Sequence, residues 1–449
     1  MRIITLGLAF LTICFTAFGQ STIDPCASHQ YIDHLDSLYP GFRKAADQTY
    51  LHAISETKQT DVLNKAKPLD TIYTLQVVFH VVWFNNEHNI HDSLITTQLK
   101  TINDAFNRRN ADTVNMRDLF KSVAGNSRIE FVLAKTDPDG NPTNGITRTK
   151  TYRSTFNASG SASQQDYIKS ESFGGVAAWN SDKYLNIWIG NLNLSNGNRS
   201  LFGYAYPPVN EANWPSTYYV GKDKQGVVLH YEVVGENNPA KLARGTYTIE
   251  KTAVHEVGHY LGLRHIWGDA PWGVNGCTVD DYIDDTPNTG SRTTSCSWYP
   301  NTCTMADDMP DQIENYMDYS PAYCTNMFTA QQIRVMRYNL VNLRPGLAES
   351  KVVFEEEEEE KVIANSEFWV PNPIKQSLHL NAKSTFAVGD VISIKVYDLY
   401  GRLVFEGSGE MMSNQATFKL NFLAVGIYDV SFTSALNGKI GGWKVVKVE

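Results

Sequence analysis

The sequence has no excess of basic residues and no internal repeats. Its 449 residues include 39 Lys and Arg against 48 Asp and Glu, which gives a formal net charge of −9. The chain is therefore not expected to bind nucleic acid or an anionic membrane surface, because both depend on a basic field. The length predicts more than one domain, since one domain usually spans ~100–200 residues.

Long apolar runs are confined to the amino terminus. The uncharged stretch 3–18 follows Arg2 and leads into a small-x-small sequence that ends at Gly19, so residues 1–19 are predicted to form a secretory signal peptide. The run is shorter than the ~20 apolar residues of a membrane-spanning helix. No second run follows, so the mature protein is not expected to be an integral membrane protein. A lipid-anchored Cys14 is the alternative, but a bulky residue precedes it.

Cysteine is scarce, with six in the chain and five after the predicted signal cleavage. An exported protein can form disulfides, and the odd count leaves one thiol over. Four cysteines cluster in one segment and predict two bridges, for which the sequence alone allows three pairings. These four are Cys277, Cys296, Cys303 and Cys324, whereas Cys26 stands alone near the amino terminus.

The first half of the chain changes from polar to alternating strand and helix patterns. Residues 20–69 are polar and carry no motif, which is typical of a propeptide. Residues 70–346 are predicted to form an α/β catalytic domain, in which a nearly continuous apolar run marks a buried strand. Strands are expected at 75–84, 129–133, 184–189 and 227–229, and helices at 32–38, 42–58, 92–106 and from Ile249.

The last hundred residues have a different composition. Six consecutive glutamates, Glu355 to Glu360, repel one another and mark residues 347–365 as an acidic linker. Residues 366–449 contain short alternating strands between turns rich in Gly and Asn, which predicts a small all-β sandwich.

The sequence HEVGHYLGLRH, which begins at His255, carries the chemistry. His255 and His259 are four residues apart, so on a helix their imidazoles share one face and can bind one metal ion. Gly262 lets the helix end in a sharp turn, because glycine takes positive φ without strain, and the turn brings in His265. Three protein ligands and a water make a catalytic zinc site. Glu256 is then the general base that passes a proton to the leaving amine.

Other interpretations of this motif agree less well with the sequence. A bare HExxH motif also arises by chance on amphipathic helices, but the extended form with a helix breaker is far rarer. A surface adhesin with an inactive protease fold would lack Glu256 or a ligand, and all are present. A structural metal module would need a fourth ligand in the mature domain, and none lies at motif spacing.

A methionine follows the zinc motif within Asn315-Tyr316-Met317-Asp318-Tyr319. Alone, Met317 would be an ordinary core residue. After the long zinc motif it resembles the methionine turn of metzincin metalloproteases. That resemblance implies a catalytic domain with a twisted mixed sheet and an active-site helix, Met317 packed beneath the imidazoles, and Tyr319 bonded to the tetrahedral oxyanion.

Within the metzincins the chain resembles the pappalysin family, in its bacterial ulilysin-like and cytophagalysin-like branch. Ile266 stands where astacins carry Glu and serralysins carry Pro. The resemblance covers about residues 75–343 and rests on segments 77–82, 252–254, 267–269, 284–287, 315–319 and 326–329.

The pappalysin resemblance implies further features of the loop after the zinc motif. It implies the pairs Cys277 with Cys303 and Cys296 with Cys324. It also implies a bound calcium ion at Asp281, Asp284 and Thr286, with oxygen ligands of the kind that calcium prefers. An acidic solvated loop is the alternative.

The same resemblance implies a latent precursor, in which Cys26 is a fourth zinc ligand that excludes the catalytic water until the propeptide is removed. An inert or oxidised thiol is the alternative. Relatives that cut beside arginine carry an acid where this chain has Tyr323, in the specificity pocket, and Pro321 replaces another acid. Arginine specificity is therefore in doubt.

The tail resembles the C-terminal sorting domains of the type IX secretion system, through segments 370–373, 395–401, 423–428 and 444–448. A carbohydrate-binding or adhesive sandwich is the alternative. Taken together, we expect a zinc endopeptidase with calcium that acts on protein or peptide substrates. We expect the type IX machinery to export it to the medium or the outer surface of a Gram-negative bacterium.

Overall fold

The computed structural model describes most of the chain. The predicted signal peptide and most of the predicted acidic linker lie outside the described residues. These are 26–63, 71–199, 201–208, 222–240, 251–269, 274–297, 300–304, 309–349, 368–383, 389–398, 403–436 and 438–448.

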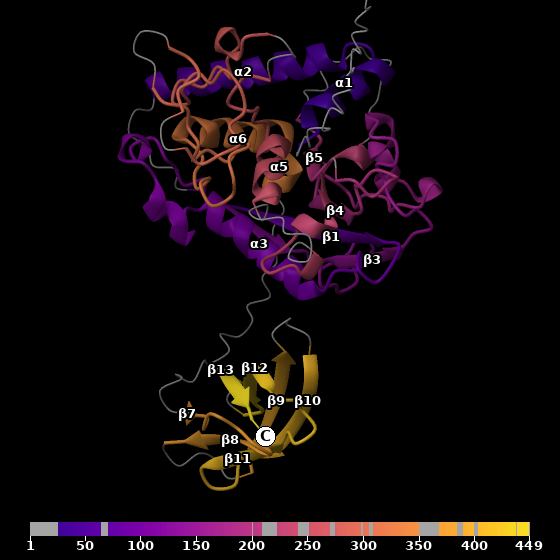
Figure 1. The fold of residues 1–449 in the computed structure, drawn as a ribbon, viewed down its shortest axis with the longest axis vertical. Helices are drawn as coiled ribbons and strands as arrows, with labels where there is room; N and C mark the ends of the chain where they lie inside the picture. The colour runs from indigo at the N-terminus through magenta and orange to yellow at the C-terminus, as the bar shows by residue number, and fades with distance from the viewer. Residues whose placement is uncertain are drawn as a thin grey trace, which may run out of the picture.

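A six-stranded mixed sheet is the scaffold of the catalytic unit (Figure 1). Its strands are β1 (Tyr73–Trp83), β2 (Ile129–Leu133), β3 (Ile146–Lys150), β4 (Tyr184–Gly190), β5 (Gly203–Ala205) and β6 (Val227–His230). β2 and β3 pair in parallel with successive parts of one edge of β1, and β4 pairs in parallel with the other edge. β6 continues the parallel order, whereas β5 runs antiparallel to β6 at the end of the sheet. This arrangement confirms the predicted fold class.

The helices complete the unit and two of them come from the predicted propeptide. They are α1 (Ser28–Leu38), α2 (Phe42–Leu63), α3 (Asp92–Phe106), α5 (Thr252–Tyr260), α6 (Ala330–Leu343) and α7 (Pro345–Ala348). Short 3-10 helices span Ala111–Asn115, Asp118–Phe120, Ala162–Lys169, Glu171–Phe173, Lys222–Lys224, Tyr231–Val233 and Gly276–Thr278. In Figure 1, α2 and α1 lie along the side of the unit opposite to α3.

Side chains on the two faces of the sheet belong to different cores, because successive residues of a strand point to opposite faces. Ile187 and Ile189 of β4 belong to the main core, which also contains residues of α3, α5 and α6. Trp188, between them, belongs to a second core together with Tyr31 of α1 and Phe42 of α2. The propeptide helices therefore complete a core of the catalytic unit.

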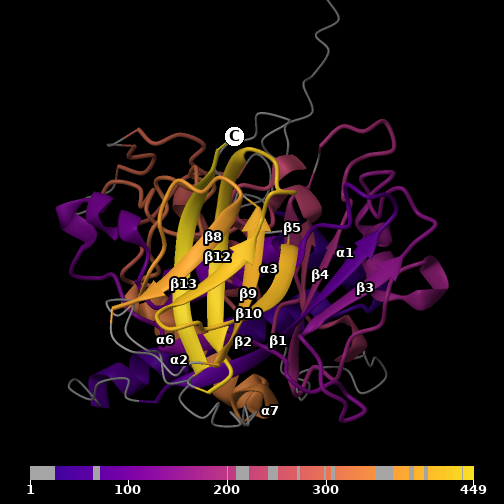
Figure 2. The same cartoon turned by 90° about the horizontal axis from the view of Figure 1, so that it is seen from below.

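The C-terminal residues form two antiparallel sheets around one core, as predicted (Figure 2). The four-stranded sheet has the order β10-β9-β12-β13 and the three-stranded sheet the order β11-β8-β7. Their bounds are β7 (Phe368–Trp369), β8 (Ser377–Ala382), β9 (Val391–Asp398), β10 (Leu403–Glu410), β11 (Gln415–Lys419), β12 (Gly426–Ser434) and β13 (Gly438–Lys447). Across the part of the chain that the structure describes, no helix is both long and apolar enough to span a membrane.

Candidate active site

Helix α5 and the turn after it carry the three histidines. His255 and His259 lie one turn apart on α5, and both are buried. The helix ends before Gly262, whose φ of 98° lies in the left-handed region. Its missing side chain also matters, because a Cβ there would collide with the amide of Asn339, which donates to Leu261 O at 3.0 Å. The chain then reverses and places His265 beside the other two.

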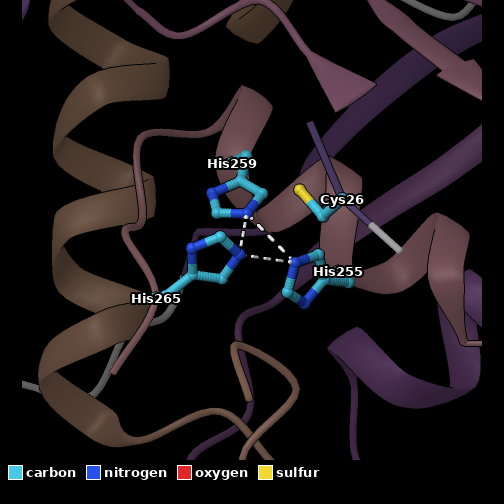
Figure 3. Close-up of side chains that lie close together, drawn as sticks. All are labelled: Cys26, His255, His259 and His265. Carbon is cyan, nitrogen blue, oxygen red and sulfur yellow. Dashed lines mark hydrogen bonds between the residues drawn. The ribbon is translucent and has the colours of Figure 1, made fainter. Parts of the chain in front are cut away.

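The three imidazoles point at one position (Figure 3). Their Nε2 atoms are 3.0 Å apart for His255 and His259, 3.1 Å for His259 and His265, and 3.2 Å for His255 and His265. The opposite nitrogen of each ring has its own acceptor. His255 Nδ1 donates to Tyr316 O at 2.6 Å, and His259 Nδ1 donates to Leu263 O at 2.8 Å.

The third acceptor is a carboxylate, since His265 Nδ1 donates to Asp269. A ring that donates from Nδ1 in its neutral form keeps its lone pair on Nε2. Burial, together with the neighbouring imidazoles, lowers the pKa of His255 well below its usual value and that of His259 to about 3. Three Nε2 atoms that lie within 3.2 Å of one another repel unless a cation lies between them, so this donor set fits a metal ion.

Met317 lies directly against the helix that carries two of the histidines. It is fully buried, and a Cβ on Gly258 would come within 2.6 Å of its sulfur. The turn is tied to α6 through an amide pair, because Asn315 and Gln332 exchange hydrogen bonds of 3.0 and 3.1 Å. Asn315 Oδ1 also accepts from Met317 N at 2.9 Å. Only a small residue at position 258 allows this contact.

Glu256 and Tyr319 flank the imidazoles and both contact the N-terminal segment. Glu256 is fully buried, and its Oε2 accepts from Ser28 Oγ at 3.0 Å and from Cys26 Sγ at 3.5 Å. The Tyr319 ring lies 5.0 Å from that of His265, and its hydroxyl donates to Cys26 O at 3.1 Å. A carboxylate and a phenolic hydroxyl thus lie beside the point at which the imidazoles converge.

The sequence matches a family model described as Pregnancy-associated plasma protein-A over residues 169–341. An extracellular metalloprotease of Arthroderma otae is 30% identical over 260 residues, which cover 58% of this chain and 74% of that protein. The chain belongs to the pappalysin family. Some curated pappalysin relatives are matched over about half of their length, as for the extracellular metalloprotease of Colletotrichum graminicola, with 36% identity over 44% of that protein.

Solved pappalysin structures resemble this one in fold and sequence. Tannerella forsythia mature mirolysin, in complex with a cleaved peptide, is 38% identical with a TM-score of 0.54, and the match covers 62% of this chain and 97% of that chain. A promirolysin mutant from the same organism is 34% identical with a TM-score of 0.56, and the match covers 72% and 97%. Membership of this family implies a catalytic metal.

A second family model, described as Secretion system C-terminal sorting domain, matches residues 370–445. This segment is the β-sandwich that contains strands β8 to β12 and most of β13. The chain is therefore a pappalysin with a secretion sorting domain, destined for the extracellular space or the cell surface.

The N-terminal segment of this pappalysin enters the site along the edge strand. Cys26 forms a parallel bridge with Gly203 of β5, and Ala27 N donates to Gly203 O at 3.1 Å. Ser28 Oγ accepts from Ala205 N at 2.9 Å while it donates to Glu256. The Cys26 sulfur and the three Nε2 atoms all lie within 4.8 Å of one another. The segment therefore reaches both the histidine cluster and the edge of the sheet.

Helices α1 and α2 continue this contact with charged and aromatic side chains. Tyr31 donates to Asp166 at 2.5 Å and accepts from the buried Lys169 Nζ at 3.2 Å. Burial lowers the pKa of Lys169 to about 8. Arg264, one residue before the third histidine, forms an ion pair with Asp47 of α2. The segment is thus anchored at several points beyond Cys26.

Both disulfides that the resemblance implied are present, Cys277 with Cys303 and Cys296 with Cys324.

The three residues implied for calcium already bind other groups of the protein. Asp281 is buried and accepts from Thr286 Oγ at 2.8 and 2.9 Å, whereas Asp284 bonds to Lys58 of α2 at 2.6 Å. Among the described residues, one group of three or more His, Cys, Asp or Glu side chains could hold a metal ion. It consists of Cys26 and the three histidines.

The role of Tyr323 in a specificity pocket stays a prediction. Its side chain is 60% exposed, and it is absent from the wall of the cavity beside His255 and Glu256. The wall contains Pro321 and Ala322 instead.

Three contributors to the site were not predicted from the sequence. Ser28 carries no motif, and its contact with Glu256 spans 228 positions in the sequence. Asp269 was noted only as part of the segment 267–269, although its spacing of four residues from His265 could have suggested the contact. Trp267 also belongs here, because its ring stacks on His265 at 4.2 Å.

We predict that Asp269→Ala weakens metal binding about 10- to 100-fold, the usual effect of losing the partner of a ligating histidine. The His265 ring would lose the charged acceptor that orients it. Zinc affinity is measured by competition with a fluorescent chelator, with Asp139→Ala in an exposed loop as the control. Unchanged affinity, or equal loss in the control, would contradict a positioning role. Thermal unfolding of the metal-free variants separates this role from a general loss of stability.

Proposed function

We propose that this chain is a secreted zinc endopeptidase that is made as a latent precursor. The observation that carries the proposal is the convergence of three imidazole nitrogens beside the carboxylate of Glu256. Imidazole nitrogens with one thiolate are a donor set that suits zinc. Zinc bound there would supply a Lewis acid that polarises the scissile carbonyl and makes a water more acidic.

The protein's own groups would perform the remaining tasks. Glu256 would take a proton from the attacking water and deliver it to the leaving amine, since its carboxylate lies beside the metal position. The Tyr319 hydroxyl, once it no longer donates to Cys26 O, would donate to the oxyanion of the tetrahedral intermediate. The acceptors of the three Nδ1 atoms would keep the rings in one tautomer throughout. Protein and peptide chains are the proposed substrates.

We propose that latency has two parts. Cys26 Sγ would be the fourth zinc ligand, which closes the coordination shell to water. Ser28 would engage the general base directly, because its hydroxyl donates to Glu256 Oε2 at 3.0 Å. Removal of the segment that carries both residues would open the metal position and release the carboxylate together.

We further propose the division of the chain that the sequence suggested. Residues 1–19 would be the signal peptide, 20–69 the propeptide, 70–346 the catalytic domain, 347–365 the acidic linker and 366–449 the sorting domain. The sorting domain would engage the type IX machinery of a Gram-negative bacterium. Mass spectrometry of the exported protein tests these boundaries, and a mature chain that retained Cys26 would refute the propeptide assignment.

The first test of this function uses Glu256→Ala. The full-length chain, with a specific protease site inserted between α2 and β1, is activated and incubated with a peptide library that is read by mass spectrometry. We expect the activated wild type to cleave, and both Glu256→Ala and a zinc chelator to reduce the rate by at least ~100-fold, the lower range for a lost general base. The control is Glu130→Gln, which should cleave normally. Glu130 lies on β2, is partly exposed and pairs with Arg109.

The closed set of four ligands also fits a structural metal module, which the same experiment addresses. A chain that binds one zinc but cleaves nothing after activation would contradict the protease function and favour the structural alternative. Cleavage that persists in Glu256→Ala would agree with the protease function but would refute the role of this carboxylate.

A second prediction concerns latency. The Cys26→Ala precursor should hydrolyse a small fluorogenic peptide at least about tenfold faster than the wild-type precursor, a factor that corresponds to ~1.4 kcal/mol. Adding Ser28→Ala should increase the rate further, because the base is then no longer engaged. Ser37→Ala on the exposed side of α1 is the matched control. Intact mass confirms that the segment is still attached. A double variant that hydrolyses the peptide no faster than the wild-type precursor would refute this account of latency.

Calcium binding at Asp281, Asp284 and Thr286 stays a prediction. Lys58 already neutralises Asp284 in the precursor, so calcium should bind better after the propeptide is removed. A ligand present at 100 times its Kd stabilises the folded state by ~2.7 kcal/mol. We therefore expect calcium to raise the unfolding temperature of the activated chain more than that of the precursor. Identical unfolding in calcium and in a calcium chelator would refute the site.

A further inference from the structure

The turn that follows the zinc motif places an indole ring on the third histidine. Gly268 N donates to His265 O at 3.0 Å, and the φ of Gly268 is 65°, so the chain reverses tightly here. Trp267 lies within the turn, and its ring stacks on that of His265 with centroids 4.2 Å apart and planes 6° apart. His265 Nδ1 donates to Asp269. The carboxylate therefore fixes the tautomer of this imidazole, whereas the indole covers one of its faces.

Trp267 also contacts Tyr319, which follows the methionine turn. The two ring centroids are 4.9 Å apart, and the ring planes meet at 78°. Tyr319 has the same geometry against His265, at 5.0 Å and 84°. In such T-shaped pairs the positive edge of one ring meets the negative face of the other, so the attraction depends on orientation. Arg292 adds a guanidinium 5.6 Å from the centre of the Tyr319 ring. Three neighbours thus define the position of this ring.

These neighbours of Tyr319 are separate from the propeptide. Trp267, His265 and Arg292 all lie within residues 70–346, the proposed catalytic domain. The Tyr319 hydroxyl, in contrast, donates to Cys26 O at 3.1 Å, and this acceptor lies in the proposed propeptide. Removal of the propeptide would take away the hydrogen bond but leave the ring contacts. After activation, the position of the hydroxyl therefore depends on the ring contacts.

We propose that Trp267 is a positioning residue, which keeps Tyr319 in place after activation so that its hydroxyl can donate to the oxyanion of the tetrahedral intermediate. This inference rests on the proposed endopeptidase function and gives Trp267 a role in it. A donor that is already in position stabilises developing charge without reorganisation at the moment of reaction. Trp267 acts through Tyr319 rather than on the substrate.

The size of the effect follows from the strength of one aromatic pair. Such a pair changes an equilibrium about 2- to 13-fold beyond the effect of its buried area. The oxyanion forms in the transition state and is absent from the bound substrate. A Tyr319 side chain that leaves its place should therefore lower kcat and leave KM unchanged.

The test uses the activated, zinc-loaded full-length chain and a fluorogenic peptide. Trp267→Leu keeps an apolar side chain but removes the aromatic ring, so we expect kcat to fall about 2- to 13-fold at constant KM. Trp267→Phe keeps a ring that can stack on His265 and should retain kcat to within about twofold. Trp83→Leu is the matched control, because Trp83 is also partly buried against the main core. Its kcat should equal that of the wild type.

A double-mutant cycle shows whether Trp267 acts through Tyr319. Tyr319→Phe should lower kcat by about 100-fold or more, the usual effect of losing one oxyanion donor. This variant keeps the ring and its packing, so a general disturbance of the fold by Trp267→Leu would still appear in it. We expect Trp267→Leu to cause no further loss in this background. The same loss in both backgrounds, or an unchanged kcat in Trp267→Leu alone, would overturn the proposal.

Zinc affinity separates this role from an effect on the metal ligand. His265 keeps its Asp269 acceptor in Trp267→Leu, so competition with a chelator should show a smaller change than the ~10- to 100-fold expected for Asp269→Ala. An equal weakening would refute the proposal, because Trp267 would then act through His265.

A measurement that leaves Trp267 unchanged tests the proposal even if its variants do not fold. A fluorinated tyrosine in place of Tyr319 reports the surroundings of this ring by fluorine NMR, because neighbouring aromatic rings shift its resonance. We expect the shift seen in the precursor to persist after the propeptide is cut away. A resonance at the value of the unfolded chain would show that the ring has left its place and that the proposal is wrong. No cleavage by the activated, zinc-loaded wild type would instead refute the endopeptidase function.

Discussion

Three imidazole lone pairs that point at one position are the constraint on which the catalytic unit depends. Each ring is oriented by an acceptor from a different segment. These are the carbonyl of Tyr316 in the methionine turn, that of Leu263 after the helix, and the carboxylate of Asp269. Without these acceptors the neutral rings would turn away from one another. The methionine turn thus packs under the helix and fixes the tautomer of His255. Gln332 of α6 holds this turn in place through its hydrogen bond to Asn315.

The N-terminal segment contacts the edge strand, the histidine cluster and Glu256. It pairs with the edge strand β5 at Gly203, places a sulfur within 4.8 Å of the three ring nitrogens and donates a hydroxyl to Glu256. Helices α1 and α2 then bury aromatic side chains against the second face of the sheet. A segment held at so many points would have to leave as a whole, so the proposed activation by proteolytic removal is compatible with these contacts.

Much of the fold and of the site could be predicted, because their signals are local. The buried strand β1, helix α3 and strands β2, β4 and β6 follow from apolar runs and helical spacing. The short strand β5 was missed, since the three residues from Gly203 to Ala205 are too few for any alternation to be visible. The exposure of Tyr323 could not be predicted either, because the direction of a loop side chain depends on its tertiary contacts.

The sequence by itself determined the identity of the three histidines, Glu256 and the chain reversal at Gly262, because residues four apart on a helix and a glycine turn obey local geometry. Only the tertiary structure decided what surrounds them. Ser28 reaches Glu256 across 228 positions, and Lys251 meets Asp112 across 139. Such contacts follow from how separate elements pack together, and no periodicity or spacing in the sequence predicts that packing.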